Sequence, residues 1–264
     1  NKLIDLTKNQ HETIIDLVVW PETAILFDII DKDNQNFLSK ENFKNIDNLI
    51  IGGIRKENIN KNFFFYNFFF LIDNTNLVIH YHDKIKLVPF GEFIPFRNIL
   101  KDYSILLGGY DFSSGKKLNP LNLNNGIRLL PLICYEVIFP KITKLKKNNY
   151  DVIVNITNDA WFGNSRGPYQ HLALAKIRAV LEGKYMLRVA NTGISSIVDY
   201  KGNIIDKIDL NKSGVIDKKL VLYKNNTLYS LVGDSIFYIL LLVLSLIIIV
   251  IYFKNSFKEK YERQ

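Results

Sequence analysis

Three residues that can do chemistry follow apolar segments at widely separated points of the chain. Glu22 ends the run DLVVWPE, Lys84 follows NLVIHYHD, and Cys134 follows IRLLPLI. In α/β proteins, functional groups gather at the carboxyl ends of strands. If each apolar run is a strand, the three side chains converge on one site. We then predict that the Cys134 sulfur lies within about 4–5 Å of both partner side chains.

A thiol, a carboxylate and an ammonium group together can carry acyl transfer. A thiol is a poor nucleophile until it loses its proton, and a nearby carboxylate can accept that proton. When sulfur attacks an acyl carbon, negative charge develops on the carbonyl oxygen. A fixed cation and a backbone N–H stabilise that charge, and losing one such donor costs about 3–4 kcal/mol of barrier.

Taken singly, each of the three residues also has an ordinary structural explanation. A lone cysteine after a strand commonly serves as a small buried residue, as Cys134 would. A glutamate after proline, such as Glu22, is commonly a charge at a helix start. A lysine beside an aspartate, as Lys84 is beside Asp83, is commonly a solvated side chain.

The elements that must position these residues alternate between strands and helices early in the chain and form hairpins late. This order predicts an α/β layered domain with mixed sheets. The patterns predict helices at 39–49 and 168–184, and strands at 16–20, 50–54, 62–73, 76–82, 127–137, 150–159, 186–191, 195–208 (a hairpin turning at Lys201-Gly202) and 214–223.

Composition excludes several classes of protein. Hydrophobic residues make up 48% of the chain, so it is not disordered as a whole. One cysteine excludes a disulfide framework and a cysteine-based zinc site, and the four histidines lack the spacing of metal ligands, so no metal is expected. The formal net charge of +8 favours an anionic partner, either nucleic acid or phospholipid head groups.

Residues 236–253 read IFYILLLVLSLIIIVIYF, without a charge. At 1.5 Å per residue this helix would span about 27 Å, just enough for a bilayer core. A buried core helix is the alternative, but such a helix normally shows a polar stripe. Tyr238 and Tyr252 stand near the two ends, as interfacial aromatics do. The basic tail 254–264, with Lys254, Lys258, Lys260 and Arg263, is predicted to be cytoplasmic.

The segments VVWPETA, HDKIKLVPFGEFIPFR, ICYEVIFP and NITNDAWFGNSRGPYQHLALAKIRAVLEGKYMLRVANTGIS resemble the nitrilase (carbon–nitrogen hydrolase) superfamily and, more closely, its apolipoprotein N-acyltransferase family. The resemblance covers roughly residues 1 to 253. It implies a nitrilase-like four-layer αββα sandwich in residues 1–228, then a transmembrane helix at 236–253 and a cytoplasmic tail. The family's N-terminal membrane domain and first nitrilase strand have no counterpart here, so a truncated chain is expected.

The resemblance also implies roles for individual residues. Cys134 is the nucleophile, Glu22 the general base and later acid, and Lys84 the oxyanion stabiliser. The supporting residues are Glu92, which orients the site, Tyr135, whose N–H is an oxyanion donor, and Glu136; Trp161 and Phe162 form an aromatic loop at the substrate entrance. The alternative for the two aromatic residues is core packing.

The activity implied by the resemblance is N-acylation of apolipoproteins through a Cys thioester. Its partners are a membrane phospholipid as acyl donor, a diacylglyceryl apolipoprotein as acceptor and the lipid bilayer, with no cofactor and no nucleic acid. The implied location is the bacterial inner membrane, with the catalytic domain on the periplasmic face. A membrane-tethered amidase or nitrilase with the same Glu-Lys-Cys triad is the alternative, and a non-enzymatic membrane scaffold is a third.

Overall fold

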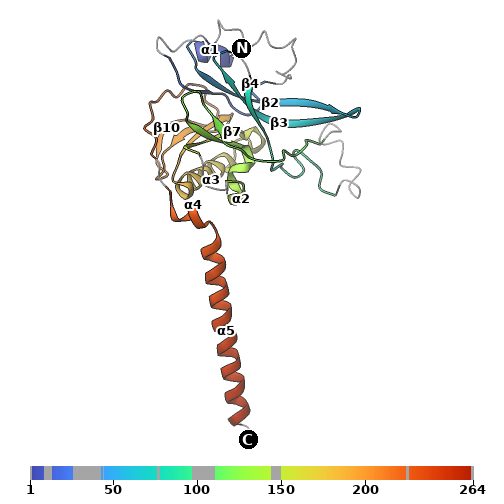
Figure 1. The fold of residues 1–264 in the computed structure, drawn as a ribbon, viewed down its shortest axis with the longest axis vertical. Coiled ribbons are helices and arrows are strands. Elements are labelled where there is room, and N and C mark those ends of the chain that lie inside the picture. The colour runs from blue at the N-terminus through green and yellow to red at the C-terminus, as the bar shows by residue number, and fades with distance from the viewer. Residues whose placement is uncertain are drawn as a thin grey trace.

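The computed structural model of the chain describes residues 2–8, 14–25, 43, 45–75, 78–96, 111–143, 150–223 and 226–262. Its strands form two sheets, and a long helix leaves the globular part towards the C-terminus (Figure 1). The first sheet contains, in spatial order, β1 (Val18–Val19), β2 (Asn48–Ile59), β3 (Asn62–Asp73) and β4 (Val78–Asp83). The second contains β10 (Ile204–Ile208), β9 (Ser195–Val198), β8 (Tyr185–Asn191), β7 (Val152–Asn158), β6 (Arg128–Ile133) and β5 (Leu121–Asn122).

Helices flank the sheets and connect their strands. The described helices are α1 (Lys2–Lys8), the 3-10 helix η4 (Cys134–Ile138), α2 (Pro140–Thr143), the 3-10 helix η5 (Asp159–Phe162), α3 (Gly167–Glu182), α4 (Leu228–Val232) and α5 (Ser235–Glu262).

Both sheets are mixed, as the sequence predicts. In the first, β1 runs parallel to β2, and β2, β3 and β4 are antiparallel. In the second, β6, β7 and β8 are parallel, with antiparallel neighbours at both edges. The predicted hairpin of β9 and β10 is confirmed. At its turn Gly202 takes a φ of 85°, a conformation that glycine adopts without strain.

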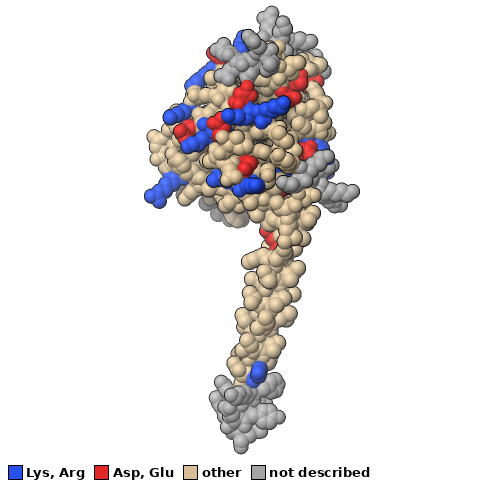
Figure 2. Space-filling model, turned by 90° about the vertical axis from the view of Figure 1, so that its left-hand side faces the viewer, with Lys and Arg blue, Asp and Glu red and all other residues tan. Residues whose placement is uncertain are grey.

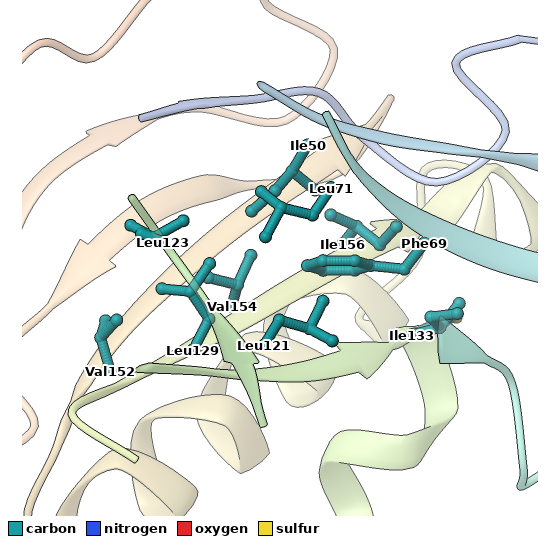
Figure 3. Close-up of a cluster of buried hydrophobic side chains, with 11 residues drawn as sticks. Ile50, Phe69, Leu71, Leu121, Leu123, Leu129, Ile133, Val152, Val154 and Ile156 are labelled. Carbon is teal, nitrogen blue, oxygen red and sulfur yellow. The ribbon is translucent and has the colours of Figure 1, made fainter. Parts of the chain in front are cut away.

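Three apolar clusters separate four layers. Between the sheets, Ile50 and Phe69 of the first sheet meet Val154 and Ile156 of the second (Figure 3). Leu3 of α1 packs against a second cluster on the outer face of the first sheet. A third cluster packs α3 onto the outer face of the second sheet. The order of layers is therefore α, β, β, α, the predicted sandwich.

Helix α3 lies on the second sheet because one of its faces is apolar and small. Ala175 and Ala179 are fully buried there and let the helix approach the strands closely. Pro168 stands in the first turn, where its missing N–H breaks no helical bond. The helix ends at Gly183, whose φ of 65° lets its N–H cap the carbonyls of Ala179 and Val180, as glycine commonly does after a helix.

The predicted helix at 39–49 is wrong over its described C-terminal part. Residues 39–42 and 44 lie outside the described residues, but Ile46 forms a parallel bridge with Ile15, and β2 begins at Asn48. The Asn48 amide also donates to the Asp16 carbonyl at 2.9 Å. Burial of the following residues in a sheet outweighs the weak helix propensity of this segment.

The predicted strand at 214–223 is also wrong, because the structure shows no strand there. Side chains hold this segment instead. Leu222 packs against the cluster between the sheets, and the Tyr223 ring meets Tyr200 edge-on at 5.7 Å. Lys218 pairs with Asp206 at 3.3 Å. Alternating apolar residues can therefore mark a segment that packs by its side chains without joining the sheet.

Helix α5 is 28 residues long and contains the predicted membrane segment. The stretch Ser235–Asn255 has a mean hydropathy of 3.1, and none of it is buried against the rest of the chain. Figure 2 shows it as a stalk of mostly uncharged residues below a charged globular body. Within the described residues, this is the one helix long and apolar enough to cross a membrane.

Candidate active site

Lys84 stands at the centre of a buried group of charged side chains at the end of β4. Its ammonium group lies 2.7 Å from Glu92 Oε1 and 3.2 Å from Glu22 Oε1, and its side chain is about as buried as any in the protein. Its backbone N–H donates to the carbonyl of Asn67 on β3 at 2.8 Å, which ties the residue to the sheet. Lys84 is therefore not a solvated surface lysine.

Glu22 is held by hydrogen bonds from both sheets. Asn67 Nδ2 donates to Glu22 Oε1 at 2.6 Å, and the Asn158 backbone N–H donates to Oε2 at 2.7 Å. Gly52 lets this turn approach the sheet, since a Cβ there would stand 2.6 Å from the Pro21 carbonyl oxygen and 2.7 Å from Glu22 Cα. Glu22 follows β1 as a buried, oriented carboxylate, not as a helix-start charge.

Glu92 completes the carboxylate pair around the ammonium group. Its Oε1 also accepts from Asn67 Nδ2 at 3.0 Å, and its Oε2 accepts from the Val88 N–H at 2.9 Å. The loop after β4 is thereby folded onto Lys84. Burial lowers the pKa of Lys84, but the charges of Glu22 and Glu92 raise it above its usual range, so the ammonium group keeps its proton.

Cys134 follows β6 directly and begins η4 with a φ of 50°. The predicted strand at 127–137 is therefore wrong over residues 134–137, which form the 3-10 helix. Burial first, and the charge of Glu22 second, raise the pKa of its thiol to about 12, whereas Lys84 lowers it. The effects of Glu22 and Lys84 on the thiol indicate that the three groups are neighbours. The sulfur distances of about 4–5 Å stay a prediction.

Glu136 links the two halves of the site. It is fully buried, and its Oε2 accepts from the N–H of Ile133, the residue before the cysteine, at 2.8 Å. Its Oε1 accepts from the N–H of Ile85, the residue after Lys84, at 2.6 Å. Burial would raise the pKa of this carboxyl, but hydrogen bonds from His82 and these N–H groups hold it below its usual value.

The predicted entrance residues lie in η5, after β7. The side chain of Trp161 is 74% exposed, which contradicts core packing, and Phe162 is 43% exposed. The Phe162 ring meets His171 edge-on at 6.0 Å. Tyr135 is half-buried, and its ring packs edge-on against Phe139 at 4.9 Å.

Sequence reasoning missed several buried polar residues of this region. Asn67 is the one polar residue within FFFYNFFF other than Tyr66, and it joins Glu22 to Glu92. Asn155 and Arg188 likewise interrupt apolar strands, and Asp159 follows one. A buried polar side chain needs partners, so a lone one inside an apolar strand is the signal that could have found them.

This arrangement can activate a thiol as it attacks. The site contains two carboxylates and one ammonium group, so it carries a net negative charge. This charge disfavours a resting thiolate. The thiol can therefore pass its proton to Glu22 during attack, and Lys84 stays charged to face a developing oxyanion.

A model of the family described as carbon–nitrogen hydrolase matches residues 1–223. A protein of Rhizobium rhizogenes called apolipoprotein N-acyltransferase is 43% identical over 214 residues, covering 78% of this chain and 39% of the relative. One of the same name from Rickettsia prowazekii is 39% identical over 254 residues, 93% of this chain and 49% of the relative. The chain thus spans less than half the length of these two relatives.

Among solved structures, the chain is similar to Saccharomyces cerevisiae Nit3, described as a member of branch 10 of the nitrilase superfamily. The TM-score is 0.54 with 21% identity, covering 75% of this chain and 74% of that one. The likeness shows the fold, and it agrees with the two-sheet sandwich found here. By its sequence match and its fold, the chain belongs to the carbon–nitrogen hydrolase family.

Proposed function

We propose that the protein transfers a fatty acyl group from a membrane phospholipid to the N-terminal diacylglyceryl cysteine of apolipoproteins. The observation that carries this proposal is the buried contact of Lys84 with Glu22 and Glu92 in the site that also holds the Cys134 thiol. The choice of acyl transfer is supported by the relatives named apolipoprotein N-acyltransferase, which are up to 43% identical to this chain.

In the first step, the Cys134 sulfur attacks the ester carbonyl carbon of the phospholipid while Glu22 accepts the thiol proton. The carbonyl electron pair moves to oxygen, and Lys84 and the Tyr135 N–H stabilise the resulting oxyanion. When the tetrahedral intermediate collapses, the ester C–O bond breaks. Glu22 returns the proton to the departing glyceryl oxygen, which leaves a lysophospholipid and a thioester.

In the second step, the α-amine of the diacylglyceryl cysteine attacks the thioester carbon. Glu22 accepts a proton from the amine, the oxyanion forms again beside Lys84, and the C–S bond breaks. The proton then passes to the Cys134 sulfur, which restores the thiol and leaves an amide-linked acyl chain. Glu92 and Glu136 orient the site, and the exposed Trp161 and Phe162 contact the incoming lipid.

Helix α5 supplies the membrane setting. Its apolar stretch of 21 residues would extend about 32 Å, the thickness of a bilayer core. A site held beside the bilayer spares each acyl CH₂ the transfer into water, about 0.8 kcal/mol. We propose that the tail 254–264 is cytoplasmic and the site periplasmic. An antibody to a tag after Gln264 should then bind only once the inner membrane is broken, and binding before that point would refute the orientation.

A membrane-tethered amidase or nitrilase is the second candidate, and the nitrilase fold favours it. The two reactions share the acyl-enzyme and differ in the final acceptor. A hydrolase passes the acyl group to water, whereas a transferase keeps the thioester until an amine arrives.

The test incubates the complete membrane protein with phospholipid and follows Cys134 by mass spectrometry. We expect one acyl adduct on the parent, none on Cys134→Ala and little turnover with Cys134→Ser, since a serine hydroxyl is much harder to deprotonate. Addition of a diacylglyceryl lipopeptide should discharge the adduct onto the peptide amine. An adduct on the Ala variant would reject Cys134 as the nucleophile, and discharge into water without peptide would favour the hydrolase.

A further inference from the structure

A buried polar cluster lies against the backbone of Cys134, and the steps above do not use it. It contains Asn155 and Arg188 from neighbouring strands, Asp159 from η5 and His171 from α3, and all four side chains are buried. Burying such groups is unfavourable unless they are paired, so the cluster must be closely connected.

Asp159 holds the cluster together. Its Oδ1 lies 2.9 Å from His171 Nδ1, and its Oδ2 accepts from Arg188 Nη2 at 2.8 Å. Arg188 also donates through Nη1 to Asn155 Oδ1. Gly193 packs against the carboxylate, since a Cβ there would stand 2.8 Å from both Cβ and Cγ of Asp159. The imidazole ring therefore has little freedom to turn.

The cluster acts on the carbonyl of Cys134. His171 Nε2 lies 3.3 Å from that oxygen, and Asn155 Nδ2 donates to it at 3.4 Å. A carbonyl oxygen only accepts, so Nε2 is the donor. The φ of 50° at Cys134 is in the left-handed region, which costs a residue with a Cβ about 1–2 kcal/mol. Such a conformation persists only where its surroundings determine it.

We propose that His171, oriented by Asp159 and Arg188, is a positioning residue for Cys134. It holds the Cys134 carbonyl through Nε2 and thereby keeps the turn that places the thiol beside Glu22 and Lys84. This inference rests on the proposed function only in taking Cys134 as the nucleophile.

The charges of the cluster fit this role. Burial lowers the pKa of Arg188, and the charge of Asp159 first, with smaller effects of Cys134 and Glu22 from the site, opposes that shift. The cluster therefore faces the site electrostatically as well as through the cysteine backbone. A purely apolar filling of the space around His171 would leave the Cys134 carbonyl with Asn155 as its side-chain donor, at 3.4 Å, in place of Asn155 and His171.

Two amide replacements of His171 separate positioning from packing. In His171→Gln the side-chain amide can reach the position of Nε2, whereas in His171→Asn it reaches only that of Nδ1. The probe is p-nitrophenyl acetate, a small activated ester that acylates a thiol and releases a coloured phenol. It carries no lipid, so the assay still reports on Cys134 if lipoprotein transfer fails, and failures of the two proposals are distinguishable.

With the complete protein in its membrane, we expect the acylation burst of His171→Asn to be about tenfold slower or more, since small displacements of a nucleophile have such effects. His171→Gln should stay within about threefold of the parent, and the half-saturating ester concentration should not change in either. Parental rates in both variants would overturn the proposal. Equal losses in both, with unchanged unfolding temperatures, would overturn it as well, because packing alone would then explain them.

If His171→Asn does not fold, Asp159→Asn takes its place. This replacement keeps the shape of the carboxylate and removes the charge that orients the imidazole ring. The same slowing of the burst is expected, and a parental rate in a folded Asp159→Asn protein would overturn the proposal.

Discussion

Replacing Glu136 by Gln is expected to destabilise the protein strongly, because this carboxylate ties the two sheets together beside the site. Its Oε1 accepts from the N–H groups of Ile85 and Lys86 at 2.6 and 3.3 Å. Its Oε2 accepts from the Ile133 N–H at 2.8 Å and lies 3.3 Å from His82 Nε2. A glutamine at this position can place its NH₂ group where either Oε1 or Oε2 now lies. In both orientations the NH₂ group faces hydrogen-bond donors and cannot accept from them.

The magnitude follows from the bonds that this change removes. At least two of the four contacts lose their acceptor, and hydrogen bonds to a charged group contribute about 1.5–3 kcal/mol each. We therefore expect the free energy of unfolding to fall by about 3–6 kcal/mol, with the melting temperature falling about 2–4 °C per kcal/mol. Acyl-enzyme formation should fall as well, because the neighbours of Lys84 and Cys134 lose their anchor.

The assay is denaturant unfolding of the protein in detergent, with Glu57→Gln as the matched control. Glu57 also accepts from a cationic group, Arg55, at 3.0 Å, but its side chain is 41% exposed. The loss of such an exposed pair costs about 0–1 kcal/mol. A loss for Glu136→Gln no larger than that of the control would refute the reasoning.

The pH dependence of the free energy of unfolding gives a second test of the role of Glu136. Its folded pKa lies below its unfolded pKa. Its contribution to stability is therefore complete above the unfolded value, about 4.3, and is lost as the pH falls through the folded value. The parent should lose stability more steeply than Glu136→Gln below about pH 4, and the two curves should converge.

Two further outcomes can be measured directly. Removing the negative charge in Glu22→Gln should lower the pKa of the Cys134 thiol from about 12. Iodoacetamide should then modify the thiol faster at about pH 8 although acyl transfer is lost, and slower modification would contradict this assignment of charges. Gly193→Ala should cost about 1–3 kcal/mol of stability, because its methyl group would collide with buried Asp159. Gly214→Ala is the control, with no neighbour nearer than 3.6 Å, and an equal loss in both would contradict the packing argument.

The positions of Glu22, Lys84 and Cys134 could be predicted from sequence because each ends an apolar strand, and strand ends gather functional groups. The residues that hold them in place could not be predicted. Asn67 and Asp159 gain their hydrogen-bond partners only when distant strands pack together. A lone asparagine among aromatic residues indicates that a partner exists but not which one.

Two of the errors in secondary structure, those at 39–49 and 214–223, have a related cause. Residues 45–49 form a turn and the start of a strand because Ile46 pairs with Ile15, a contact that no local pattern encodes. Residues 214–223 alternate in hydropathy as a strand would, yet Leu222 is anchored by packing alone. Local patterns show where apolar and polar residues alternate. They do not specify which strand or cluster the segment packs against.

The thiol and its base come from different sheets, and this has a consequence for the order of synthesis. Glu22, Lys84 and Glu92 follow strands of the first sheet and leave the ribosome before Cys134, which follows a strand of the second. Until the sheets dock through contacts such as Phe69 with Ile156, the cysteine has an ordinary thiol with no carboxylate to take its proton. An unfinished or half-folded chain therefore lacks the assembled base, cation and thiol, and the proposed chemistry begins only when the fold is complete.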